Sequence, residues 1–187
     1  MKSRRFGIVA VSLAVIVGAA ITAGRYAGLR LNFTDSAPHG LWFVRGSSPD
    51  TVKRGQLVEI CPPQSPLIRL MSDRGYLSRG DCPGDIMPLL KPVSAVAGDT
   101  VQIATGALVR VNGATLPNTR SMPAIPAWPA GTYTVKAGQI WVFSSYSAGS
   151  FDSRYFGPVS LSGFRGQARP LVVAGNVEAI SRGVIKQ

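Results

Sequence analysis

The sequence has few of the residues that most enzymes use for chemistry. It contains one histidine, His39, and two cysteines, Cys61 and Cys82, and these show neither CxxC nor HxxxH spacing. Because a protein-bound metal ion needs several such ligands at suitable spacing, no metal site is expected. The chain also lacks a Walker phosphate loop, a GxSxG elbow and an HExxH helix. The sequence therefore predicts no cofactor.

The single histidine is poorly placed for a catalytic triad. His39 lies three residues after Ser36, with Pro38 between them. A Ser-His-Asp triad needs the imidazole within hydrogen-bond reach of the serine oxygen and an acid on its other nitrogen, which so local a loop rarely provides. We interpret His39 as a solvated loop residue. If the protein is an enzyme, the remaining option is a serine with a base other than histidine.

Acidic residues are scarce as well. Nine Asp and Glu stand against 20 Lys and Arg, which gives a formal net charge of +11. Such a surplus suits nucleic acid or anionic lipid headgroups. The basic residues are scattered one or two at a time, however, without a basic helix or a basic patch interleaved with aromatics. Nucleic-acid binding is not expected, because net charge without a motif is a weak signal.

The chain has one long hydrophobic run, at its N-terminus. Lys2, Arg4 and Arg5 precede an uncharged stretch over residues 6–24. At about 1.5 Å per residue, a helix of this length crosses a hydrocarbon core of roughly 30 Å. The sequence therefore predicts a single transmembrane anchor that contacts the lipid bilayer.

A cleaved signal peptide is the alternative interpretation of this segment. Its apolar region is usually only about 7–15 residues long, and residues 21–23 form a weak cleavage site. Both interpretations carry the remainder of the chain out of the cytoplasm, because a long following domain is translocated largely regardless of its charges. The predicted organisation is a cytoplasmic N-terminus over 1–5, an anchor over 6–24 and an extracytoplasmic domain over 31–187.

Glycine and proline are abundant, at 21 and 14 residues, and only 16% of residues are charged. This composition favours a turn-rich, mostly-β fold. The pair Asn112-Gly113 predicts a type I′ hairpin turn, and residues 68–76 are the one moderately helical stretch after the anchor. β-branched and aromatic runs predict strands over residues 40–44, 56–60, 100–103, 108–111, 132–135, 140–143 and 171–174. We expect one antiparallel domain on a membrane stalk.

The two cysteines favour a disulfide. Cys61 and Cys82 form an even pair in a domain that is expected outside the cytoplasm. The alternative is two unrelated buried thiols.

Lys91 stands out because it is the only charged residue between Ile86 and Gly98. Inside such an apolar, strand-like run a lysine can be forced partly out of water, which lowers its pKa. A neutral lysine amine can then accept a proton from a serine hydroxyl. The alternative is a lysine that snorkels from a strand edge into solvent.

A third polar cluster follows the predicted strand over residues 140–143. Asp152 and Arg154 are expected on the same side of an extended strand, where a charge-assisted bond can pin the backbone. Ser150 lies two residues before Asp152 and is expected to share that face. The alternative is a polar turn without a functional role.

The order and spacing of three stretches carry a specific resemblance. They resemble the motif series of type I signal peptidases, the membrane-anchored Ser/Lys proteases, and above all their conjugative-transfer branch, the TraF-type pilin-maturing peptidases. The stretches are "TDSAPHGLW", "LLKPVSAVAGDTV" and "GSFDSRYFGPV". The residues that match the branch's motifs are Asn32, Thr34, Ser36, Pro38 and Gly40, then Lys91, Val93, Gly98 and Asp99, then Asp152 to Tyr155, Gly157 and Pro158.

The chain departs from the family pattern at two places. Ala37 follows the serine where signal peptidases commonly have methionine. The housekeeping branch usually has Gly-Asp-Asn before its last motif, where this chain has Ser144-Ser145-Tyr146. The chain is also short, with little room for the large extra β-domain of some housekeeping enzymes. These departures favour the conjugative branch.

The resemblance implies a signal-peptidase-like β domain and specific residue roles. Ser36 is the expected nucleophile and Lys91 the general base. The Ser36 backbone N–H and the Thr34 hydroxyl are the expected oxyanion hole. Ser150 is expected to orient the lysine, while Asp152 and Arg154 hold the site together. No role in the chemistry itself is expected for that last pair.

The resemblance also implies a substrate and a location. We expect a peptidase of the bacterial cytoplasmic membrane, with its catalytic domain in the periplasm, that processes a membrane-tethered pilin precursor, with cyclisation as a further outcome. The alternatives are a general signal peptidase for exported preproteins and a non-catalytic assembly module of a secretion apparatus. The substrate is expected to add along a strand edge, and residues 40–44 are predicted to be such an edge. Trp42 and Phe43 are then expected at the membrane interface, or alternatively in the core.

Overall fold

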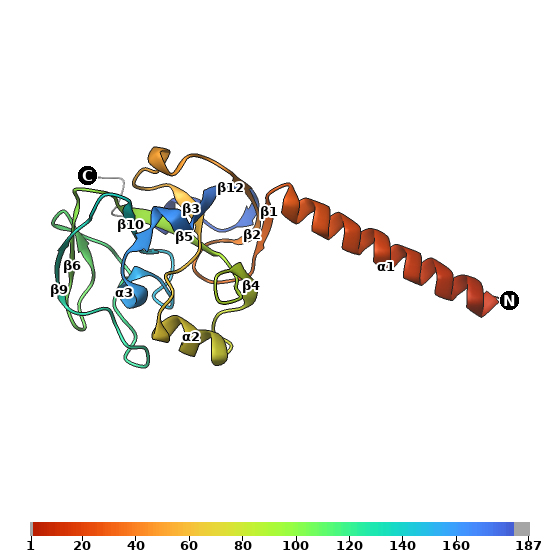
Figure 1. Cartoon of the computed structure of the whole chain (residues 1–187), viewed down its shortest axis with the longest axis horizontal. Helices are drawn as coiled ribbons and strands as arrows, with labels where there is room; N and C mark the ends of the chain where they lie inside the picture. The colour runs from red at the N-terminus through yellow and green to blue at the C-terminus, as the bar shows by residue number, and fades with distance from the viewer. Residues whose placement is uncertain (1, 182–187) are drawn as a thin grey trace.

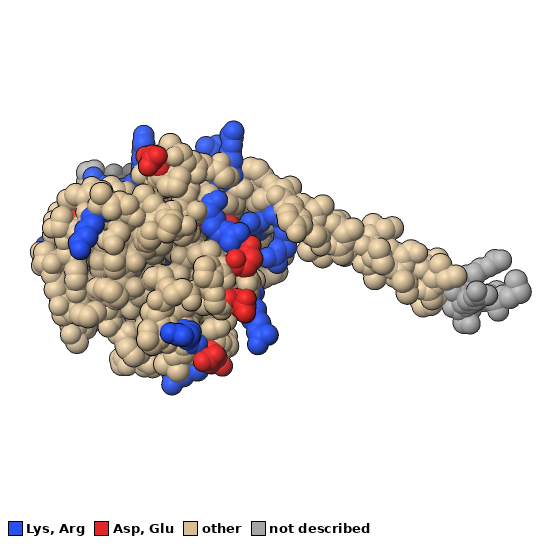
Figure 2. All heavy atoms as spheres, in the orientation of Figure 1, with Lys and Arg blue, Asp and Glu red and all other residues tan. Residues whose placement is uncertain are grey.

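The apolar N-terminal run forms one long helix, α1 (Lys2–Tyr26), in a computed structural model of the chain. The structure describes residues 2–181, so the first residue of the predicted segment 1–5 and residues 182–187 of the predicted domain 31–187 lie outside the described residues. Helix α1 projects away from a β-rich domain (Figure 1). Its stretch Phe6–Tyr26 has a mean hydropathy of 2.4, and its length and composition suffice to cross a membrane. Most of the apolar side chains of Phe6–Tyr26 are exposed, and the visible surface of this stretch shows no Lys, Arg, Asp or Glu until it nears the domain (Figure 2).

Within residues 2–181, eleven of the twelve strands form two antiparallel sheets. The larger sheet has the order β1-β2-β12-β3-β5-β10-β11, and the smaller has the order β8-β7-β6-β9. The smaller sheet lies at the end of the domain farthest from α1 (Figure 1). Strand bounds in the larger sheet are β1 (Leu29–Asn32), β2 (His39–Arg45), β12 (Phe164–Ala174), β3 (Leu57–Ile60), β5 (Leu89–Ala95), β10 (Gln139–Val142) and β11 (Val159–Ser160). Those in the smaller sheet are β8 (Ala114–Thr115), β7 (Arg110–Val111), β6 (Thr100–Ile103) and β9 (Gly131–Thr134).

Short helices and one further strand complete the domain. Helix α2 begins after Ser65, whose hydroxyl accepts from the Ile68 N–H at 3.2 Å as an N-cap. The bounds are α2 (Pro66–Asp73), α3 (Ser153–Phe156), β4 (Arg79–Cys82) and the 3₁₀ helices η1 (Pro49–Thr51), η2 (Leu161–Gly163) and η3 (Val177–Ser181). The predicted fold class, a mostly-β antiparallel domain with one N-terminal apolar helix, is confirmed.

Local sequence signals account for much of this arrangement. Each predicted strand overlaps an observed one, and Asn112 and Gly113 have φ values of 48° and 85°, as a type I′ turn requires. Gly40 has φ 136°, and a Cβ there would lie 2.2 Å from the Val172 carbonyl oxygen. Only glycine lets β2 and β12 approach so closely.

The prediction for residues 40–44 is wrong in one respect. Strand β2 is not an edge, because it pairs with β1 on one side and β12 on the other. Trp42 is fully buried, and its indole N–H donates to the Pro38 carbonyl at 3.1 Å. Of the two interpretations, Trp42 follows the core alternative, since the sheet is wider here than the local pattern indicates. Phe43 is partly buried.

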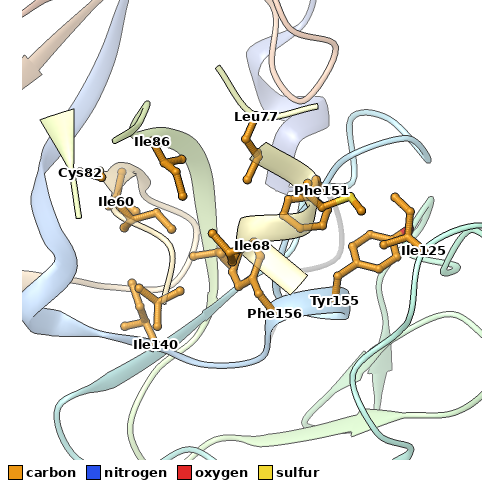
Figure 3. Packing of buried hydrophobic residues seen from close by; sticks show 14 of the residues in the cluster. Ile60, Ile68, Leu77, Cys82, Ile86, Ile125, Ile140, Phe151, Tyr155 and Phe156 are labelled. Carbon is orange, nitrogen blue, oxygen red and sulfur yellow. The ribbon is translucent and has the colours of Figure 1, made fainter. Parts of the chain in front are cut away.

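A core cluster supports the segment that carries Ser150 and Asp152. Phe151, between them, stacks on Tyr155 and packs edge-on against Phe156. Figure 3 shows these rings beside Ile68 of α2. Because Phe151 points into this core, its two polar neighbours are free to face the other way.

The predicted disulfide is present. Cys61, just after β3, is bonded to Cys82 at the end of β4, with a sequence separation of 21. In the chain-entropy account, closing a loop of this size stabilises the fold by about 3 kcal/mol. The bridge ties the α2 region to the larger sheet.

Candidate active site

Ser36 lies in the loop between β1 and β2, and this loop is organised by one side chain. The Asn32 side-chain amide donates to the carbonyls of Thr34, Ala37 and Pro38 at 3.0, 2.9 and 3.1 Å. Its oxygen accepts from the Thr34 backbone N–H at 3.2 Å. These side-chain bonds pair loop backbone groups that are not paired by strand–strand hydrogen bonds between β1 and β2. Ser36 is thereby presented half-buried at the surface of the sheet.

Lys91 reaches Ser36 from the middle of the larger sheet. Strand β5 pairs with β3 and β10, so that Lys91 is only 2% exposed. Its Nζ lies 2.7 Å from Ser36 Oγ and 2.9 Å from Ser150 Oγ. The structure therefore brings together three predicted site residues that are 55 and 59 positions apart in sequence. The alternative interpretation, in which Lys91 snorkels into solvent, is therefore wrong.

Burial sets the protonation of Lys91. The pKa of its amine is lowered from 10.5 to about 8, mainly because burial disfavours the ammonium ion. Asp152 raises the pKa and Arg154 lowers it, so the two neighbours oppose each other. The neutral fraction at pH 7 is accordingly about a tenth, roughly two to three orders of magnitude above that of an ordinary lysine. The amine can therefore accept a proton from Ser36 near neutral pH.

Asp152 and Arg154 form a buried ion pair, but not on an extended strand. Asp152 is the N-cap of helix α3, and both residues are fully buried. The Arg154 Nε and Nη2 donate to the two carboxylate oxygens at 2.8 Å each. The prediction of a shared strand face is wrong, because the N-cap preference of aspartate turns the chain into a helix here. The predicted charge-assisted contact nevertheless exists.

Arg154 also ties distant loops to the site. Its Nη1 donates to the carbonyls of Asn118, Arg120 and Ala148 at 3.0, 3.2 and 3.1 Å. A guanidinium has five N–H groups in a fixed plane, so it can join several chain segments at once. These contacts of Arg154 hold loops together and do not involve Ser36.

Two other predicted loop residues take part in local bonds. The Thr34 hydroxyl donates to the Asn32 side-chain oxygen at 2.8 Å. His39 is exposed, as expected, but it is the first residue of β2 and not a loop residue, because it pairs with Ala174 of β12; its Nε2 lies 3.0 Å from Asp35 Oδ1. Within residues 2–181, no group of three or more His, Cys, Asp or Glu is arranged to hold a metal ion.

The site and the fold together define a class of protein. A buried lysine amine against a serine hydroxyl can activate that hydroxyl as a nucleophile. Residues 3–173 match the family described as "Signal peptidase, peptidase S26", and the chain belongs to this family. The resemblance predicted from the motifs is confirmed. The family indicates a serine peptidase.

Curated relatives extend the comparison. The chain is 38% identical over 176 residues to "Probable conjugal transfer protein TraF" of Sinorhizobium fredii, covering 91% of this chain and 90% of the relative. It is 36% identical over 179 residues to "Plasmid transfer protein TraF" of Escherichia coli, covering 92% and 97%. Among solved structures, signal peptidase I of Enterococcus faecalis aligns with a TM-score of 0.37 at 17% identity, covering 63% of this chain and 96% of that one.

Proposed function

We propose that this protein is a membrane-anchored serine endopeptidase of conjugative transfer that processes a membrane-tethered pilin precursor. Ser36 is the nucleophile and Lys91 the general base. The observation that carries the proposal is the 2.7 Å contact between a buried lysine amine and the Ser36 hydroxyl. Relatives that are named conjugal or plasmid transfer proteins support the conjugative setting.

The proposed reaction has two stages. Neutral Lys91 takes the hydroxyl proton as Ser36 Oγ attacks the scissile carbonyl, and the resulting ammonium returns a proton to the leaving amine. An acyl ester on Ser36 remains. Water resolves it to a linear product, or the substrate's own N-terminal amine resolves it to a ring. Ser150, at 2.9 Å, keeps the Lys91 amine aimed at Ser36.

The oxyanion of the tetrahedral intermediate needs donors. We assign this role to the Ser36 backbone N–H and the Thr34 hydroxyl. The latter must first turn away from the Asn32 oxygen to which it donates at 2.8 Å. One such donor typically contributes about 3 kcal/mol to lowering the barrier.

The substrate is proposed to bind where the membrane and the sheet meet. Strand β1 is the end strand of the larger sheet and immediately precedes the Ser36 loop, so an extended peptide can add to its free edge. Tyr26, Leu31 and Phe33 are exposed by 91%, 58% and 74% between the end of α1 and Ser36. In the proposed orientation, basic residues 2, 4 and 5 stay in the cytoplasm and the disulfide-containing domain lies in the periplasm.

Co-expression with a small pilin-like membrane protein tests the function. Intact mass of the product separates the outcomes, because a ring is lighter by one water, about 18 Da, than the linear trimmed chain. A trimmed pilin of either mass supports the proposal. An untouched pilin beside cleaved preproteins would indicate a general signal peptidase. If both remain uncut, the chain acts as a non-catalytic assembly module.

The processing rate is expected to rise with pH through an apparent pKa of about 8, the lowered value of Lys91. The amine is a base only when it is neutral, so activity is lost as the pH falls below this pKa. A pH–rate profile under single-turnover conditions measures the ascending limb. A rate that keeps rising without levelling off until the pH approaches the 10.5 of an ordinary lysine would contradict the role of burial.

A further inference from the structure

Ser144 is a fully buried serine that no motif of the family predicts. It follows β10 and occupies the position where the housekeeping branch usually has the glycine of Gly-Asp-Asn. Its hydroxyl donates to the backbone carbonyl of Ser36 at 2.6 Å, across 108 positions of sequence. The bond therefore ends on the residue that carries the nucleophilic oxygen.

The direction of this hydrogen bond is set by its neighbours. The Tyr146 backbone N–H donates to Ser144 Oγ at 3.2 Å, so one lone pair of that oxygen is already used. A carbonyl oxygen can only accept, so the single hydroxyl proton must point at Ser36. Because the Ser144 hydroxyl both donates and accepts a hydrogen bond, its rotation about the side-chain bond is restricted.

The backbone of Ser144 is clamped by both members of the buried ion pair. Its N–H donates to Asp152 Oδ2 at 3.0 Å, and its carbonyl accepts from Arg154 Nη2 at 3.2 Å. The carboxylate thus binds the N–H of Ser144, and the guanidinium binds its carbonyl. Charge-assisted bonds in a buried site are stronger than neutral ones, so Ser144 is a stiff support.

We propose that Ser144 is a positioning residue for Ser36, and that the Asp152–Arg154 pair acts on the nucleophile through it. Fixing the Ser36 carbonyl restricts the Ser36 backbone torsions, and these torsions aim Oγ at the Lys91 amine. The Asn32 amide holds the loop from the β1 side, and Ser144 holds it from the β10 side. This inference rests on the proposed function of Ser36.

The structure separates this role from that of Ser150. Ser150 contacts Lys91 directly at 2.9 Å, so its loss should alter the base. Ser144 contacts the backbone of the nucleophile, so its loss should leave the pKa of Lys91 in place. A positioning defect lowers the rate of the chemical step without weakening substrate binding.

The test compares full-length Ser144→Ala with Ser65→Ala. Ser65→Ala also removes a hydroxyl that bonds a backbone group, the Ile68 N–H at the cap of α2. Ser144→Ala is expected to lower kcat for pilin processing about 10- to 100-fold, with KM and the apparent pKa unchanged. Ser65→Ala is expected to stay within about threefold of the parent protein, since a cap affects helix stability and not the site.

A second readout does not need the natural substrate. An activated acetate ester acylates a positioned serine directly, and intact mass counts the acyl groups on Ser36. Ser144→Ala is expected to slow this acylation by a similar factor, and Ser144→Thr, which keeps a hydroxyl donor, is expected to recover part of it. Parent-like acylation by Ser144→Ala, a rise in KM alone, or a shifted pH profile would overturn the positioning role. If the parent protein itself takes up no acyl group, the proposed function fails instead.

Discussion

Ser36→Ala and Lys91→Met are each expected to reduce processing by roughly 10⁴-fold or more while the domain remains folded. Ser36 Oγ lies 2.7 Å from the Lys91 amine and is the proposed nucleophile. Lys91 is the only side chain in hydrogen-bond contact with that oxygen among residues 2–181. Because nucleophile and base act as a unit, the double variant is expected to lose little more than either single one.

Time courses of product mass measure this loss, and two matched variants serve as controls. Lys136→Met and Ser47→Ala make the same chemical changes at exposed positions. Both are expected to process at the parent rate. Near-parent processing by Ser36→Ala or by Lys91→Met would refute the dyad. Unchanged tryptophan fluorescence of the domain shows that each variant is folded, since Trp42, Trp128 and Trp141 all lie within it.

The ion pair and the base depend on each other through charge. Asp152 alone would hold Lys91 in the ammonium form, and Arg154 alone would drive it further toward the amine. Their effects oppose each other, and burial is the largest cause of the lowered pKa of Lys91. The same pair hydrogen-bonds the backbone of Ser144, whose hydroxyl donates to the Ser36 carbonyl. In the roles proposed for Lys91 and Ser36, one buried contact therefore affects both the protonation of the base and the placement of the nucleophile.

Strand positions followed from sequence where the signal is local. Residues 100–103 are predicted and observed with the same bounds, because β-branched residues are bounded by turn residues there. For β12 the local pattern predicts only residues 171–174, although the strand begins at Phe164. Arg165, Gln167 and Arg169 interrupt its apolar pattern, and its length depends on pairing with both β2 and β3. Such pairing is set by tertiary contacts, which a local pattern does not contain.

The candidate site was predictable in part. The apolar neighbours of Lys91 allowed burial, because a strand covered on both faces reads as a continuous apolar run, but they left a snorkelling lysine open as well. The pairing of Lys91 with Ser36 could not be predicted from spacing, since the two residues lie 55 positions apart. The family motifs predicted it. Ser144 was visible only as a departure from Gly-Asp-Asn. Its contact joins loops that are 108 positions apart, so only the fold reveals it.

Lys91→Met is also expected to stabilise the folded domain at pH 7, by on the order of 3 kcal/mol. The folded protein holds this amine at a pKa of about 8, against 10.5 for an ordinary lysine. At pH 7 both the folded and the unfolded forms carry the proton, so the parent protein bears the full cost of a buried ammonium. Methionine has a similar shape without the charge, and it removes that cost.

The stability difference between Lys91→Met and the parent protein is expected to change with pH. Between pH 8 and 10.5 the unfolded chain still binds the Lys91 proton and the folded chain does not, so the parent protein gains stability as pH rises. Above 10.5 both forms are neutral, and the advantage of Lys91→Met is expected to vanish. Denaturant unfolding of the detergent-solubilised full chain, followed by tryptophan fluorescence at pH 7, 9 and above 10.5, measures the difference.

Lys136→Met is the control for this measurement, because Lys136 is exposed and its substitution should give no pH-dependent difference from the parent. Titration of tyrosines at high pH affects all three proteins alike and cancels in the comparison. A Lys91→Met variant that is less stable than the parent at pH 7 would mean that the bonds to Ser36 and Ser150 outweigh the cost of burial. The lysine would then be an anchored ammonium, and a base with a lowered pKa could not be assigned to it.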